Sequence, residues 1–297
     1  MNLIKKLYKK LFISGYWTIA MADLSKSNEF VSMYDNKKNW AADPFIVEHN
    51  GKIFIFVELY DYKNKRGKIA VAEFKNLSEK LQFEVIISDK YHFSYPNIFK
   101  FNNEYYMIPE SGENLSVDLY HAVDFPYKWE KVKTLLFGED YADSTFFDFE
   151  NKKYLINYQK KEGKFSLNLY EFCLNKFELI QVDSIITKND NIRPAGNFFY
   201  KNNKIYRPSQ KNDLCYGEAI IINEVNGLFD EKIVTTVFPS QIKVLNKKIN
   251  RVHTLNFLNE MCVIDAFCEK FDLFKIFNMG TRIFRRIIKQ GRKKHEK

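Results

Sequence analysis

Residues 43–56 read Asp-Pro-Phe-Ile-Val-Glu-His-Asn-Gly-Lys-Ile-Phe-Ile-Phe. A polar residue and a proline are followed by an apolar run, an Asn-Gly pair and a second apolar run. Val, Ile and Phe favour pleated strands, and Asn-Gly between two such runs is typical of a two-residue β-hairpin turn. This stretch therefore predicts a β-hairpin that begins at a polar residue.

The same pattern returns four times along the chain. The later copies begin at Tyr95, Asp143, Arg193 and His253. Successive starts are 48 to 60 residues apart, and each hairpin is followed by further strand-like runs, such as 68–74 and 82–87 after the first. About four strands in a repeat of ~50 residues is typical of one blade of a β-propeller.

Five copies predict an all-β fold, a single five-bladed β-propeller over residues 15–268. The strand-like run 15–20 is expected to complete the last blade and close the ring, which removes the sheet edges that invite aggregation. A β-sandwich with coincidental spacing stays open as the alternative. An α/β fold is disfavoured, because no long helical pattern interrupts residues 20–270.

The net charge of +9 is concentrated at the two ends of the chain. Residues 1–16 contribute +4 and residues 282–297 contribute +7, which leaves −2 for the rest. Apolar residues recur at helical spacing beside the lysines and arginines, so we expect short basic amphipathic helices within segments 1–14 and 269–297. Such helices bind an anionic membrane surface, although their apolar faces could instead pack on the body.

The composition also narrows the partners and the compartment. The basic residues do not form a stripe interleaved with aromatics, so nucleic acid is not an expected partner. The four cysteines show no CxxC or zinc spacing, and no motif of a metal or cofactor site is present, so we expect neither a metal nor a cofactor. No apolar run approaches the ~20 residues that span a bilayer. We expect a cytoplasmic protein, held peripherally on the inner membrane by its ends.

Polar residues head all five repeats. The innermost strands of a propeller surround a central channel and begin at the same end of it, so the five head residues should face one another. The second strands return to that end and also finish in polar residues. These strand ends add Glu58, Glu110, Arg207 and Gln210 to the candidate site.

This set of side chains points to sugar chemistry. Carboxylates around a pocket can perform acid and base steps at a glycosidic centre, and we predict Asp43, Glu110 and Asp143 as catalytic residues. Arginine matches the geometry of phosphate, which indicates a sugar nucleotide as donor substrate. Tyr216 is one of the aromatics that could stack on a sugar. The predicted substrate-binding residues are Glu58, Tyr95, Arg193, Arg207, Gln210 and His253.

The blocks that carry these residues resemble a known family. The blocks are 40–45, 93–96, 107–111, 143–147, 193–196, 206–210, 216–217 and 253–254. In order and spacing they resemble the propeller-like domain at the N-terminus of plant glucosamine inositolphosphorylceramide transferases, over about residues 15–265. The resemblance extends to stand-alone bacterial members, often encoded with surface-polysaccharide genes.

A more distant similarity joins this family to five-bladed glycosidases of families 32, 43 and 68. Those enzymes place an aspartate at the start of the first blade as base or nucleophile, and Asp43 matches it. They also use an acidic Glu and a further Asp from later blades, for which Glu110 and Asp143 are candidates. Arg193 departs from the pattern, because a simple hydrolase is expected to keep an acidic or neutral group there.

The sequence therefore predicts a carbohydrate-active protein, with a glycosyltransferase of bacterial capsule or lipopolysaccharide synthesis as the first hypothesis. In this hypothesis Asp43 is the base on the acceptor hydroxyl, while Arg193, Arg207 and His253 hold the donor phosphate. Two alternatives stay open. One is a glycoside hydrolase or phosphorylase that uses Asp43 and Glu110. The other is a glycan-binding module without catalysis.

Overall fold

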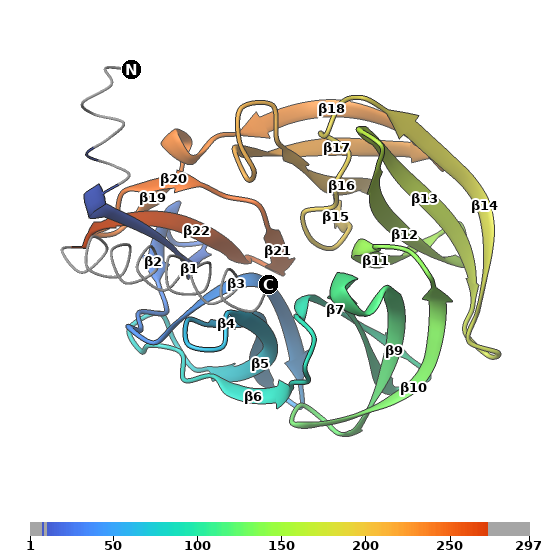
Figure 1. The fold of residues 1–297 in the computed structure, drawn as a ribbon, viewed down its shortest axis with the longest axis horizontal. Coiled ribbons are helices and arrows are strands. Elements are labelled where there is room, and N and C mark those ends of the chain that lie inside the picture. Colours follow the sequence, from blue (N-terminus) through green and yellow to red (C-terminus); the bar gives the residue numbers. More distant parts are fainter. Residues whose placement is uncertain (1–7, 9–10, 273–297) are drawn as a thin grey trace, which may run out of the picture.

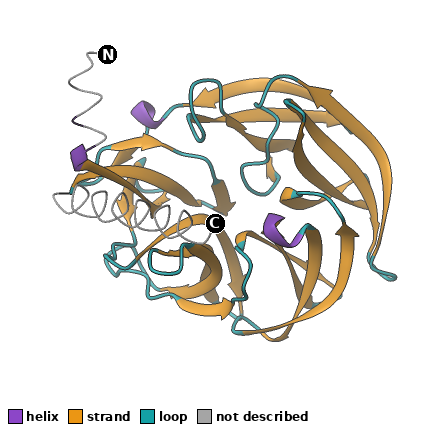
Figure 2. Ribbon diagram, viewed as in Figure 1, coloured by secondary structure: helices purple, strands orange, loops and turns teal. Residues whose placement is uncertain are grey.

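The computed structural model describes residue 8 and residues 11–272. The described chain consists almost entirely of strands and turns (Figure 2). Its sheets stand around a common centre as five blades, so the predicted all-β five-bladed propeller is confirmed (Figure 1). Among the described elements, none is a helix long and apolar enough to cross a membrane.

Blades 1 and 2 follow each other along the chain, and each is an antiparallel sheet whose strands pair in sequence order. Blade 1 consists of β3 (Asn39–His49), β4 (Lys52–Asp61), β5 (Arg66–Phe74) and β6 (Glu84–Ile87). Blade 2 consists of β7 (Ser94–Phe101), β8 (Glu104–Ser111), β9 (Ser116–Asp124) and β10 (Lys128–Phe137), with the short 3-10 helix η1 (Gly112–Asn114) between β8 and β9.

Blades 3 and 4 repeat this arrangement. Blade 3 consists of β11 (Ala142–Phe149), β12 (Lys152–Lys161), β13 (Lys164–Cys173) and β14 (Glu178–Thr187). Blade 4 consists of β15 (Phe199–Lys201), β16 (Lys204–Lys211), β17 (Ala219–Gly227) and β18 (Asp230–Val237). In both blades the first strand lies nearest the centre (Figure 1).

Blade 5 is built from both ends of the described chain. Its strands are β21 (Leu255–Leu258), β22 (Met261–Phe271), β1 (Ile13–Asp23) and β2 (Glu29–Ser32), with β20 (Ile249–Arg251) beside β22 and β19 (Lys243–Val244) beside β2. The short 3-10 helix η2 (Pro239–Gln241) precedes β19. Blue β1 lies along red β22 in Figure 1, paired from Ile13↔Phe271 to Asp23↔Met261. The predicted closure of the ring by residues 15–20 is therefore confirmed.

The amphipathic helices expected in segments 1–14 and 269–297 lie mostly outside the described residues. The described residues of segment 1–14 are helical at positions 8, 11 and 12, and the structure differs from the expectation only further inward. Residues 13–14 begin β1, and residues 269–271 end β22, so both stretches are strand rather than helix. Their backbone groups pair with each other across the sheet, which a helix would not allow.

The core of the propeller lies between the blades. Within the described residues, buried apolar side chains form five clusters, one in each gap between neighbouring blades. Successive residues of a strand point to opposite faces, so Ile46 packs toward blade 5 while Phe45 packs toward blade 2. Full burial of such a side chain contributes roughly 1.5–3 kcal/mol, and the repeated pattern therefore holds all the blades in one ring.

The first three blades share a kink at the mouth of the channel. Asp43, Tyr95 and Asp143 have positive φ angles of 50°, 45° and 48°. Each lies where the pairing of its inner strand shifts register, as in a β-bulge. A non-glycine residue in this left-handed region is strained by about 1–3 kcal/mol and tends to occur at functional sites. The repeat heads are thus special backbone positions as well as polar ones.

Candidate functional site

A pocket of about 260 Å³ opens at the mouth of the central channel, and all five blades contribute to it. Six of the residues predicted from the sequence line it. They are Asp43, Glu58, Glu110, Asp143, Arg193 and His253. The pocket is thus rich in carboxylates and also holds an arginine and a histidine, which are the usual materials of a catalytic or binding site.

On one side of the pocket a histidine lies between two carboxylates. His253 Nε2 is 3.4 Å from Asp43 Oδ1, and His253 Nδ1 is 2.5 Å from Asp265 Oδ2. The hydroxyl of Thr254 donates a 2.9 Å hydrogen bond to Asp43 Oδ1. All three charged side chains are buried, so their interactions are strong.

Burial and charge shift the pKa values of this group. Burial raises the pKa of Asp43 to about 7, although the positive charge of His253 opposes the rise. Burial disfavours a charged His253, but the carboxylates of Asp265 and Asp43 outweigh it and raise the pKa of His253 to about 9. At neutral pH the imidazole therefore carries a positive charge, and Asp43 can take up or release a proton.

On the other side of the pocket an arginine binds two carboxylates. Arg193 binds Asp143 through Nε and Nη2, the latter 3.2 Å from Oδ1, and Nη2 lies 3.4 Å from Glu110 Oε2. Gln210, which does not line the pocket, donates a 3.1 Å hydrogen bond to Asp143 Oδ2. Burial and the neighbouring Asp143 raise the pKa of Glu110 well above its usual value, while Arg193 opposes the rise. This shift favours the protonated acid at Glu110.

Carboxylates also hold the kinked backbone of the mouth, because the amides of the three left-handed head residues each donate to an acid of the preceding blade. Asp43 N–H donates to Asp265 Oδ2 at 3.2 Å, and Tyr95 N–H donates to Asp43 Oδ2 at 3.3 Å. Asp143 N–H donates to Glu110 Oε2 at 3.1 Å. An ionised carboxylate strengthens such a hydrogen bond, and a protonated carboxyl group can still accept one. The acids that line the pocket therefore also join the blades.

Three predicted substrate-binding residues do not line the pocket. Tyr95 is fully buried below it, where its hydroxyl contacts Thr145 Oγ1 at 2.9 Å and accepts the N–H of Gly196 at 2.9 Å. Gln210 stands behind Asp143, as described above. Arg207 is directed to the outer strand of its blade, where Nε and Nη2 bind both carboxylate oxygens of Glu231 at 2.6 and 2.7 Å. For Arg207 the structure thus shows a structural ion pair.

Sequence reasoning missed several residues that shape the pocket. They are Trp17, Trp40, Tyr60, His92 and Ser94. Trp40 stacks on Tyr60 with ring centroids 4.5 Å apart, and Trp17 stacks on His253 at 4.3 Å. Tyr216, named above as an aromatic that could stack on a sugar, contacts both Arg193 and His253 from the loop before β17. Trp40 lies three residues before Asp43, and this closeness to a repeat head could have identified it. His92 lies in the loop before β7, which is not part of the repeated pattern.

One cluster in the site has the side chains of a metal centre. Asp43, His253 and Asp265 each offer a ligand atom, and these atoms lie within 4.8 Å of one another. A histidine ligates a metal only as the neutral imidazole. The raised pKa of His253 and its place between two carboxylates favour the imidazolium. The cluster therefore fits an ion-paired triad better than a metal site, and the expectation of no metal stays a prediction.

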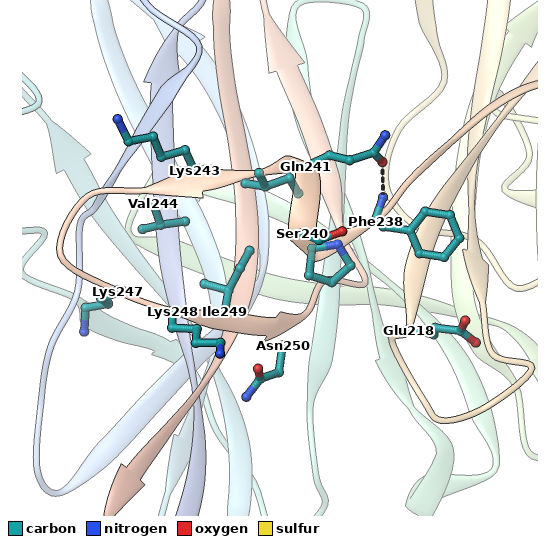
Figure 3. Close-up of a pocket in the computed structure, with 12 residues that line it drawn as sticks. Glu218, Phe238, Ser240, Gln241, Lys243, Val244, Lys247, Lys248, Ile249 and Asn250 are labelled. Atoms are coloured by element: carbon teal, nitrogen blue, oxygen red, sulfur yellow. Dashed lines mark hydrogen bonds between the residues drawn. The ribbon is translucent and has the colours of Figure 1, made fainter.

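A second, more open pocket of about 840 Å³ lies beside η2 and β19 (Figure 3). Two of its three lysines are already engaged with other groups. Lys243 forms an ion pair with Glu29, and Lys247 Nζ lies 3.1 Å from both the Tyr16 hydroxyl and Asp35. The perturbed acids described above line the central pocket instead. We therefore place the candidate site at the channel mouth.

Comparison with solved structures shows the same fold in carbohydrate-active enzymes. A family 117 glycoside hydrolase of Zobellia galactanivorans superposes with a TM-score of 0.58 at 14% identity, covering 89% of this chain and 92% of the other. A family 62 α-L-arabinofuranosidase of Coprinopsis cinerea also gives 0.58, at 10% identity, with 76% and 90% coverage. These identities are low, so the likeness concerns the fold alone.

Comparison with protein sequences identifies closer relatives. Glucosamine inositolphosphorylceramide transferase 1 of Arabidopsis thaliana is 26% identical over 223 residues, which cover 71% of this chain and 29% of the relative. The enzyme of the same name from Oryza sativa subsp. indica is 24% identical over 230 residues, with 74% and 30% coverage. The chain thus spans less than a third of the length of these curated relatives.

A family model covers most of the propeller. The model described as "Glucosamine inositolphosphorylceramide transferase 1, N-terminal" matches residues 13–257. The match contains blades 1 to 4 and all of blade 5 except β22 and the end of β21, together with every predicted site residue. The chain therefore belongs to the family of the N-terminal domain of glucosamine inositolphosphorylceramide transferase 1.

Proposed function

We propose that this chain binds a sugar in the central pocket and transfers a glycosyl group there, with Asp43 as the base. The observation that carries the proposal is the position of Asp43, a buried acid with a pKa of about 7 that lines the pocket. A base is most effective when its pKa lies near the working pH. The name of the plant relatives supports transfer rather than another sugar reaction.

The size of the pocket limits what can enter it. Its volume of about 260 Å³ lies below the ~300–1,000 Å³ of sites that bury a drug-sized ligand. We therefore propose that it encloses a single sugar residue, with the rest of donor and acceptor outside the mouth. Trp40 and Tyr60 form one aromatic wall, which suits the apolar C–H face of a sugar ring.

Arg193 and His253 form ion pairs with carboxylates of the protein, so we do not assign them to a donor phosphate. Arg193 is neutralised by Asp143, and His253 by Asp43 and Asp265. A phosphate in the pocket would compete with these acids and meet a surplus of negative charge. The proposal therefore leaves the donor phosphate outside the pocket.

In the proposed step Asp43 removes the proton of an acceptor hydroxyl. The hydroxyl oxygen then bonds to the anomeric carbon of the donor, and the bond to the leaving group breaks with its electron pair on the leaving oxygen. The proton stays on Asp43 until solvent removes it. His253 does not titrate in this cycle, because its raised pKa keeps its charge at neutral pH.

Glycoside hydrolysis or phosphorolysis is the second candidate, and Glu110 favours it. The raised pKa of Glu110 suits an acid that protonates a poor leaving group, such as a sugar hydroxyl. A nucleotide diphosphate leaves without such help. A protonated Glu110 and a titrating Asp43 in one pocket are the acid and base that cleavage of a glycoside requires.

Transfer and cleavage can be separated with the purified chain. It would be incubated with uridine, guanosine and cytidine sugar nucleotides, with and without sugar acceptors, and separately with aryl glycosides. Donor-dependent glycoside formation supports transfer, and cleavage by water or phosphate supports the second candidate. We expect Asp43→Asn to lower the rate about 10²- to 10⁴-fold. Asp148→Asn, at an exposed surface ion pair, is the matched control and should leave the rate unchanged. Glycan binding with no turnover, unaffected by Asp43→Asn, would contradict both candidates.

The wider setting is also a proposal. We infer a cytoplasmic protein whose acceptor is a precursor of capsule or lipopolysaccharide, docked on an anionic membrane by its lysine- and arginine-rich ends. The support is the family resemblance and the charge of +7 on residues 282–297. Flotation with anionic liposomes should fall when residues 273–297 are removed. Equal flotation of both chains would contradict the docking.

A further inference from the structure

We propose that Glu58 and His92 form the part of the pocket that selects the sugar, by binding one uncharged hydroxyl beside the Trp40–Tyr60 wall. The inference rests on the proposed sugar binding and gives that site its specificity. Both residues line the pocket, Glu58 from β4 and His92 from the loop before β7. His92 has no part in the ion pairs of Asp43 and Arg193.

Glu58 offers a buried acceptor that the protein leaves incompletely bonded. The residue is only 5% exposed, and its Oε1 has no well-aligned hydrogen bond among the described residues. Its ion-pair partner is His92 Nε2, at 3.2 Å. A buried acceptor left unsatisfied costs about 1–3 kcal/mol, and more for a charged group. Oε1 has almost no exposed surface, so a ligand hydroxyl would bond to it as the carboxylate turns toward the pocket, and that bond would recover this free energy.

His92 offers a donor whose orientation is fixed. Although burial opposes the rise, Glu58 raises the pKa of His92, but the backbone N–H of Gly67 donates to Nδ1 at 3.0 Å, which keeps Nδ1 free of a proton. The ring proton of His92 is therefore on Nε2, the atom facing Glu58. The backbone N–H of His92 donates to Glu113 Oε2 at 2.9 Å, which fastens the loop to blade 2. A fixed N–H donor therefore stands beside the Glu58 acceptor.

Gly67 makes room for this arrangement. A Cβ at this position would lie 2.5 Å from Glu58 Oε1 and 2.3 Å from the carbonyl oxygen of Phe93. Any other residue would displace the carboxylate or the strand. The backbone thus approaches Glu58 as closely as a glycine permits, and it also supplies the N–H that orients His92.

The donor and acceptor together define the chemical class of the ligand group. A hydroxyl both donates and accepts, so it can bond to Glu58 Oε1 and to the Nε2–H of His92 together. An ammonium has no acceptor for that N–H, and a carboxylate would be repelled by Glu58. The geometry therefore selects an uncharged hydroxyl at this position, with the sugar ring against the aromatic wall of Trp40 and Tyr60.

The test measures binding of methyl pyranosides by calorimetry, without reliance on turnover. The best binder of the panel is compared with its single-deoxy derivatives. We expect removal of one particular hydroxyl to weaken binding about 10- to 100-fold, the range of a hydrogen bond to a charged group. Glu58→Gln should weaken binding of the parent sugar by a similar factor. The two changes should not add, because they remove the same contact.

A matched control uses the other Glu–His pair of similar geometry. His121 Nε2 lies 3.4 Å from Glu104 Oε2, outside the pocket, so Glu104→Gln should not change binding. His92→Gln provides a second variant if Glu58→Gln fails to fold. Additive losses, or binding unchanged in both pocket variants, would overturn this inference and leave the proposed function intact. Failure of every pyranoside to bind the unaltered chain would overturn both.

Discussion

The two sides of the central pocket contain the same kinds of charged groups but differ in whether these groups can titrate. Each side has two carboxylates around one cation. On one side the cation is His253, between Asp43 and Asp265; on the other it is Arg193, against Asp143 and Glu110. Arginine does not lose its proton in proteins, whereas an imidazolium does. The first side can exchange protons near neutral pH through Asp43, whose pKa is about 7, while the cation of the second is a permanent clamp.

This difference shows how one residue type acquires two roles. Asp43 and Asp143 head successive odd blades with the same left-handed backbone, with φ angles of 50° and 48°. Burial raises the pKa of Asp43 to about 7, and a titratable histidine is its partner. Asp143 is instead bound by a guanidinium and an amide. The neighbour across the channel, rather than the repeat position, decides what the acid can do.

The largest expected effect is the loss of the permanent clamp. Arg193→Met leaves the buried Asp143 and the partly buried Glu110 with no guanidinium between them. Breaking a buried ion pair from one side typically costs about 3–5 kcal/mol of unfolding free energy, and urea unfolding at pH 7 measures it. The control is Arg66→Met, which removes an exposed pair whose atoms are 3.8 Å apart and should change the free energy by less than about 1 kcal/mol. Equal losses in the two variants would contradict the assigned role of Arg193.

The next effect concerns the titrating side and its dependence on pH. The folded-state pKa of His253 is raised to about 9, against about 6.5 in the unfolded chain. The folded state therefore binds more protons in this window, so the stabilisation from His253 is complete below pH 6.5 and is lost as the pH rises to 9. We expect the stability advantage of the unaltered chain over His253→Gln to fall across the window by at most roughly 3 kcal/mol, because the loss of His253 also moves the titration of Asp43 to higher pH. Urea unfolding at pH 6 and pH 9.5 tests this, and an advantage that grows with pH would contradict a charged His253.

The smallest effect concerns the loop that connects the two sides. Gly217 has a φ of +67°, and an added Cβ would lie 3.2 Å from the Cβ of His253 and from the Trp17 ring. Gly217→Ala should lower the unfolding free energy by about 2 kcal/mol, from backbone strain and from crowding. Gly163→Ala is the matched control, because its φ is +74° and no atom lies within 4 Å of the added Cβ. Its unfolding free energy should fall by about 1 kcal/mol, from backbone strain alone. Equal losses of unfolding free energy in the two variants would mean that the added methyl group at position 217 does not crowd His253.

The sequence predicted the part of this molecule that repeats. The spacing of the hairpins gave five blades, because turn residues and strand patterns are local signals. Asp43, Asp143 and Arg193 were found because a repeat places its head residues at one end of the channel. Trp17 and His92 have no counterpart in other repeats, so only the coordinates bring them to the pocket.

Strand parity explains which strand-end residues reach the site. Arg207 and Gln210 lie three positions apart on β16, so their side chains leave opposite faces of the strand. Gln210 reaches Asp143, whereas Arg207 reaches Glu231 on the outer strand. Tyr95 shares the backbone of a head residue, but its ring is large enough to fill the channel beneath the pocket. The sequence pattern identified the strands whose ends lie near the channel mouth, but it did not determine the face from which each side chain projects.

Blade 5 is completed only after its last strand, β22, has been synthesised, and it supplies part of the surroundings of Asp43. His253 and Asp265 emerge from the ribosome after blades 1 to 4, yet they hold the backbone and the carboxylate of Asp43. A nascent chain that has made only the earlier blades has Asp43 without its proton-holding neighbours. The docking of β22 beside β1 that closes the ring also completes the surroundings of Asp43, so under the proposed function a chain without blade 5 would lack its working base.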